Sequence, residues 1–115
     1  MPVPSEIRAL IDRLNQELDQ LEAEARRGID VSRLLLVSFP NNARLTGLFS
    51  TLNNAIFFVD NFRGRIQTTV KKISSTDVSV EAVQETGEDL SEFLGLVLDA
   101  KIMVSRTVAI LENLQ

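Results

Sequence analysis

Residues Leu45 to Val59, LTGLFSTLNNAIFFV, form an uncharged run of 15 residues in a chain of 115 residues, of which 24% are charged. The run lies inside a longer segment, about 41–73, whose apolar residues have the spacing of an amphipathic helix. A helix at the surface of a protein keeps charged side chains on its wet face. The uncharged run therefore predicts a helix that is covered on more than one side.

The composition excludes several classes of functional site. The chain has no Cys and no His, so it lacks thiol chemistry, the usual general base near neutral pH and the commonest metal ligands. The net charge of −4 and the lack of a basic stripe argue against a nucleic-acid partner. We expect no catalytic residues, no metal and no cofactor.

The N-terminus and the apolar runs bear on localisation. Residues 1–4 lead directly into a polar helix without the pattern of a secretory signal. No run of 18 apolar residues occurs, because Asn53 and Asn54 interrupt the most apolar stretch, so no membrane span is expected. We expect one cytoplasmic domain, residues 1–115, which is long enough to bury a core.

Heptad spacing predicts three helices, at about 4–27, 41–73 and 79–114. The predicted apolar seam of the second helix is Leu45, Phe49, Leu52, Ile56, Val59, Ile66, Val70 and Ile73, and that of the third is Val83, Gly87, Leu90, Leu94, Val97, Lys101, Val104, Val108 and Leu111. Gly28 is a natural stop for the first helix. Pro40 suits the first turn of the second helix, with Ser38 or a nearby Asn as its cap. A polar turn, Ser74-Ser75-Thr76-Asp77, joins the second and third helices into an antiparallel hairpin.

Residues 29–39, IDVSRLLLVSF, are open to two interpretations: a short helix capped by Asp30, or an extended apolar linker packed on the bundle. A strand has no partner elsewhere in the chain. The predicted fold is all-α. It is an elongated antiparallel helical bundle, made of a long hairpin, a shorter N-terminal helix and this short helix or linker.

Both arms of the hairpin carry apolar residues away from the main seam. Phe57 points away from it, and Leu96, Met103 and Ile110 recur every seven residues, with Leu114 continuing the stripe. A turn centred near residues 76 and 77 places Phe57 level with Leu96. Either the rest of the chain covers this second face, or a second copy does so in a two-fold contact. We predict a homodimer or higher homo-oligomer through these five residues.

Charged residues also fall on or beside the seam. Arg63 occupies a core-type position level with Leu90, near Arg65 and three carboxylates, those of Glu88, Asp89 and Glu92. We interpret these five charged residues as a structural ion-pair cluster that sets the register of the helices. Lys101, at a seam position of the third helix, is expected to extend to solvent.

Four glycines lie inside the predicted helices: Gly47, Gly64, Gly87 and Gly95. Each costs about 1 kcal/mol of helix stability relative to alanine. Their spacing does not match a nucleotide-binding motif. We expect them at close helix crossings.

The predicted function is that of a non-catalytic protein-interaction or structural module. It acts through homo-oligomerisation, with acidic faces available to a further protein partner. One alternative is a bundle that binds a small apolar ligand around Phe49, Phe58 and Phe62. A second is a small all-helical enzyme that uses only Arg, Lys and carboxylate side chains.

Overall fold

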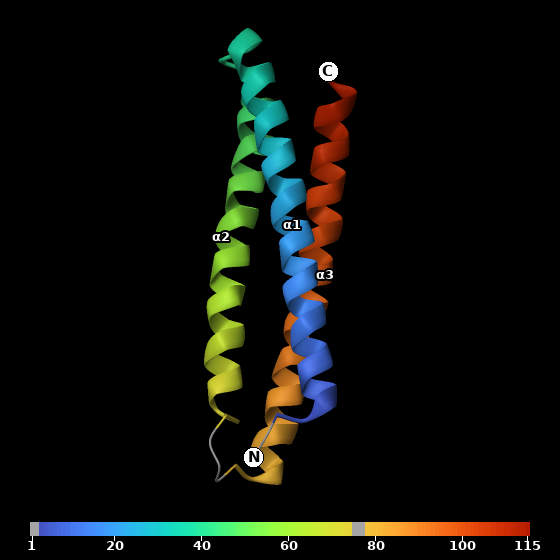
Figure 1. Cartoon of the computed structure of the whole chain (residues 1–115). Helices are drawn as coiled ribbons and strands as arrows, with labels where there is room; N and C mark the ends of the chain where they lie inside the picture. The colour runs from blue at the N-terminus through green and yellow to red at the C-terminus, as the bar shows by residue number, and fades with distance from the viewer. Residues whose placement is uncertain (1–2, 75–77) are drawn as a thin grey trace.

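The chain folds into a bundle of three long helices, in which each helix runs opposite to the one before it, as Figure 1 shows. The computed structural model describes residues 3–74 and 78–115. The helices are α1 (Ser5–Ser38), α2 (Ala43–Lys71) and α3 (Val80–Asn113), and the molecule measures 59 × 18 × 16 Å. The predicted all-α elongated bundle is therefore confirmed. α1 and α3 run in the same direction along the bundle, and α2 runs in the opposite direction.

α1 does not stop at Gly28, and this part of the sequence interpretation is wrong. A Cβ atom at Gly28 would lie 2.6 Å from Leu52 Cδ1 and 2.8 Å from Val108 Cγ2. The glycine thus allows three helices to approach closely, and it lacks the positive φ angle typical of a glycine that ends a helix. The helix continues to Ser38 as a full-length member of the bundle, not as a separate short helix or linker.

The other helix ends lie within two residues of the predicted ones. Asn42 caps α2, with its Oδ1 accepting a hydrogen bond from the Leu45 N–H at 3.0 Å, and Pro40 lies in the preceding turn. Ser79 caps α3 in the same way, with its Oγ accepting from the Ala82 N–H at 3.1 Å. Of the predicted turn at 74–77, residues 75–77 lie outside the described residues.

The core has heptad spacing, but it includes residues between α2 and α3 that the predicted seam left out. Leu52, Val59, Val97 and Val104 are fully buried, as predicted. Residues 62 and 93, which the predicted seam omitted, are buried as well, and their rings meet at a centroid distance of 5.4 Å. α1 packs against both other helices, which make fewer contacts with each other. One side of the α2–α3 pair is therefore covered by α1.

Candidate functional site

Arg63 joins α2 to α1 on the covered side of the α2–α3 pair. Its Nη2 lies 2.7 Å from Asp19 Oδ1 and 3.2 Å from Glu22 Oε1, and its Nη1 donates to Glu22 Oε2 at 3.2 Å. These hydrogen bonds raise the pKa of Arg63. The hydrogen bond from Arg63 likewise holds the pKa of Glu22 below its usual value, with a smaller contribution from Arg26. Arg63 thus forms an interhelical ion pair with carboxylates of α1, and not with the predicted carboxylates of α3; within α2 it lies 4.0 Å from Asp60.

Lys101 makes the equivalent link from α3 to α1. Its Nζ lies 3.0 Å from Glu17 Oε1 and 2.8 Å from Gln20 Oε1. Lys101 is partly exposed, and its ammonium group pairs with α1 at the edge of the seam. Arg63 and Lys101 both sit on helix flanks that face α1, which explains why polar residues occupy positions of the apolar seam.

The predicted ion-pair cluster is divided among three places. Arg65, Asp89 and Glu92 line one groove between α2 and α3, of about 590 Å³, while Arg63 lies on the opposite flank of α2. Glu88 lines a separate hollow between α1 and α3. Among the described residues, none of the predicted pairs between these arginines and carboxylates forms an ion pair.

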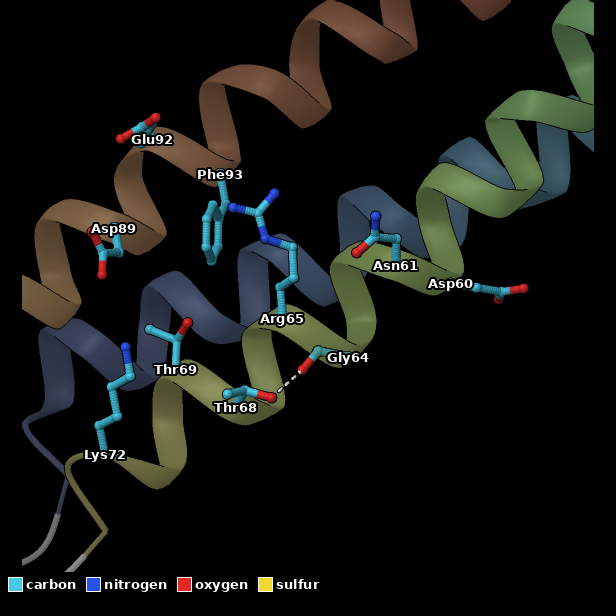
Figure 2. Close-up of a pocket in the computed structure, with 10 residues that line it drawn as sticks. All are labelled: Asp60, Asn61, Gly64, Arg65, Thr68, Thr69, Lys72, Asp89, Glu92 and Phe93. Atoms are coloured by element: carbon cyan, nitrogen blue, oxygen red, sulfur yellow. Dashed lines mark hydrogen bonds between the residues drawn. The ribbon is translucent and has the colours of Figure 1, made fainter.

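Arg65 instead lies over two aromatic rings. Figure 2 shows it beside one of them, that of Phe93. Its guanidinium carbon is 4.8 Å from the centroid of Phe62 and 4.7 Å from that of Phe93. Such cation–π contacts hold a charged group against an apolar floor. Lys72, directly after the end of α2, and Asp89 of α3 line the same groove, so both cations come from the α2 side, whereas the carboxylates come from α3 and, with Asp60, from α2.

Four of the five apolar residues of the predicted interface, all except Leu114, lie farther along α2 and α3. The exposed fractions are 71% for Phe57, 43% for Leu96 and 49% for Met103, and Ile110 is half-buried. Leu96 and Met103 lie roughly 150° around α3 from Lys101, which points to α1. We call the surface formed by Phe57, Phe58, Leu96, Met103 and Ile110 the α2/α3 face.

The position of Phe57 along the bundle, relative to α3, differs from the predicted one by two residues. The contact between Phe62 and Phe93 sets the register of the two helices. Counting back along α2 and forward along α3 places Phe57 level with about Leu98, two residues from the predicted Leu96. Residues 29–38 belong to α1, so they do not cover the α2/α3 face as one interpretation required.

Two other apolar features lie apart from this face. Leu114 lines a cleft at the α1–α2 end of the bundle, away from Phe57 and Leu96. Ile102, which the sequence interpretation missed, is 52% exposed next to Met103. The sequence did contain a signal for it, because Ile102 is an aliphatic residue directly before Met103, in the part of α3 that has apolar residues on two sides.

The phenylalanines suggested as a ligand site contact one another and nearby arginines. The Phe58 and Phe62 rings have a centroid distance of 4.4 Å, and Arg33 lies 5.9 Å from the Phe49 centroid. The rings of Phe58, Phe62 and Phe93 therefore fill the space between them.

The four predicted crossing glycines behave differently from one another. A Cβ at Gly87 would meet Ile7 Cδ1 at 3.3 Å, so this glycine does lie at a close approach of α1 and α3. Gly47, Gly64 and Gly95 have no described atom within 4 Å of the Cβ position, and all three are exposed. The prediction of close crossings is wrong for these three within the chain.

Two further classes of feature were searched within residues 3–74 and 78–115. No group of three or more Asp or Glu side chains there is arranged to hold a metal ion. No helix in this part of the chain is long and apolar enough to cross a membrane. Comparison with known proteins gave no matching family model, no matching curated protein and no matching solved structure.

Proposed function

We propose that this chain is a non-catalytic assembly module that forms a homodimer through the α2/α3 face. The observation that carries the proposal is a set of large apolar side chains, Phe57, Leu96 and Met103, exposed on the side of the α2–α3 pair that α1 leaves uncovered. Contiguous apolar surface of this kind typically marks an interface. A second copy is the partner because the surface also has complementary charges.

The two helices contribute opposite net charges to this side. α2 contributes Asp60 and Arg65, with Lys72 directly after its end, and α3 contributes Asp89, Glu92 and Asp99. Among the described residues, Asp60 lies 4.0 Å from Arg63, and the other five residues are in no ion pair. Surface charges of this kind set the orientation of a partner more than they raise its affinity.

A two-fold axis parallel to the bundle places α2 of one copy opposite α3 of the other, at the same level. The register then sets Arg65 opposite Asp89 of the second copy, and Phe58 opposite Leu96 of the second copy. An antiparallel axis instead sets α2 against α2, which offers Arg65 and Lys72 the single groove carboxylate of α2, Asp60, in place of the three carboxylates of α3. The charges therefore favour a parallel dimer.

An exposed glycine supports close contact on this side. Gly64 of α2 lines the groove beside Arg65 and has open space around its Cβ position. A glycine in the interior of a helix costs stability relative to alanine. A second helix packed against this position gives that cost a reason, because small residues allow helices to approach.

The proposal is tested by a charged substitution in the centre of the face. Met103→Glu buries a carboxylate without a partner in the dimer, and we expect it to weaken dimerisation at least tenfold. Sedimentation equilibrium measures this, with the unmodified chain expected at twice 12.8 kDa at micromolar concentration. The matched control is Ser105→Glu, which adds the same charge at an exposed residue on another side of α3.

The variant pair separates the outcomes. A Ser105→Glu chain that dimerises like the unmodified protein, beside a monomeric Met103→Glu chain, supports the face. Equal masses for Met103→Glu and the unmodified chain would show that any association uses another surface. Circular dichroism checks that both variants keep the helical content of the unmodified chain.

A further inference from the structure

The third helix ends before the other two at the α1–α2 end of the bundle. The ion pair between Arg27 and Glu112, and the approach of Gly28 to Val108, place the end of α3 level with about residue 33 of α1. α1 continues for about five more residues, or about 7 Å, before the turn into α2. Figure 1 shows this hairpin tip rising above the C-terminus.

A cleft of about 330 Å³ lies where the third helix is missing. Leu35 and Phe39 of α1, Leu45 of α2 and Leu114 at the end of α3 form its apolar lining, and Asn42 and Arg44 complete it. We call this the tip cleft. Its volume is enough for one or two apolar side chains. Nearby, Val37 is 81% exposed and Leu34 is 67% exposed, so the tip has the most exposed aliphatic side chains of α1.

The charge of the tip is opposite to that of the rest of the chain. Residues 31–50 and 111–115, which lie at this end of the bundle, contain two arginines, Arg33 and Arg44, against one acid, Glu112. Glu112 is already paired with Arg27. The first turn of α2 contains no acidic residue, so its partial positive charge is also uncompensated. The chain as a whole has a net charge of −4.

We propose that the tip cleft binds an acidic amphipathic helix of a second protein. The vacant position of the third helix fixes the shape of the occupant, because α1 and α2 there present the groove that α3 fills elsewhere. An apolar side chain of the partner enters between Leu45 and Leu114, and its acidic flank faces Arg44. This site is separate from the α2/α3 face and does not depend on dimerisation.

The test is a nuclear magnetic resonance titration of the intact, isotope-labelled chain. The probe is a synthetic 18-residue helix with Leu at the a and d positions and Glu on its flanks, compared with the same peptide carrying Lys in place of Glu. We expect the acidic peptide to shift the amide signals of Leu35, Leu45 and Leu114. We expect the basic peptide to bind about tenfold more weakly or not at all.

A pair of charge reversals checks the role of the arginine. Arg44→Glu should weaken binding of the acidic peptide about tenfold, and the control Arg13→Glu, at the far end of α1, should leave it unchanged. Shifts centred on Met103, equal binding of both peptides, or no binding of the acidic peptide would overturn the proposal. Tip signals that change on dilution without peptide would also overturn it, because the occupant would then be a second copy.

Discussion

Gly28 is the position where a single methyl group should matter most. All three helices meet there, and an added Cβ would overlap with side chains of Leu52 and Val108. We predict that Gly28→Ala lowers the free energy of unfolding by about 1–3 kcal/mol, because the surrounding core must shift to admit it. Urea denaturation followed by circular dichroism measures the change.

Gly47→Ala is the matched control for this prediction. Gly47 is also inside a helix, but no described atom lies within 4 Å of its Cβ position. The same substitution there should raise the stability by about 0.5–1 kcal/mol, since alanine favours the helix. If Gly28→Ala stabilises the protein as much as Gly47→Ala does, the close crossing at Gly28 is not present.

The sequence is least informative at single residues of this kind. A glycine that ends a helix and one that permits a crossing look alike, because both lack a side chain and only the neighbouring helices distinguish them. The same holds for Arg63. Its position in the hairpin predicted ion pairs with carboxylates of α3, whereas the carboxylates that it contacts, those of Asp19 and Glu22, belong to α1.

At the scale of the helices, the ion pair of Arg63 makes the packing of α1 on α2 depend on pH. The pKa of Glu22 is lowered in the folded protein, chiefly by the hydrogen bond from Arg63. The stabilisation from Glu22 is therefore complete above its ordinary pKa of 4.5, and is lost as the pH falls through the lowered value.

Replacement of Arg63 by Gln should remove most of this pH dependence, because only the smaller contribution of Arg26 is left. We predict that Arg63→Gln returns the pKa of Glu22 towards 4.5 and costs about 0.5–1 kcal/mol near neutral pH, with a smaller difference in acid. Carbon-detected titration of the Glu22 carboxyl group and urea denaturation at two pH values measure both effects. Arg13→Gln is the control, and an unchanged Glu22 titration in Arg63→Gln would contradict the assignment.

Helix positions were largely predictable because heptad spacing and caps are local signals. The seam was less so, since spacings of three and four residues fit two adjacent flanks of the same helix. The predicted seam through Phe49, Ile56 and Lys101 follows the flank that faces α1. The flank between α2 and α3, with Phe62 and Phe93, satisfies the same spacing and became evident only in three dimensions.

For the whole molecule, the exposed apolar residues of the two-sided helices were predictable, and their separation into two surfaces was not. Phe57, Leu96 and Met103 lie along one side, as their common period implies. Leu114 continues the same period, but it lies where α3 ends below the tip, so it lines the tip cleft instead. The cause is the length of α1, which continues past Gly28 and so extends beyond the end of α3.

The most direct measurement of the proposed assembly is the distance between two spin labels in the dimer. The chain has no cysteine, so Asn41→Cys in the exposed α1–α2 turn provides one label per copy. Pulsed electron paramagnetic resonance should give a separation within about two bundle widths, each 18 Å, because a parallel dimer places both tips together. A separation near the 59 Å length of the bundle, or no dipolar coupling at all, would contradict the account.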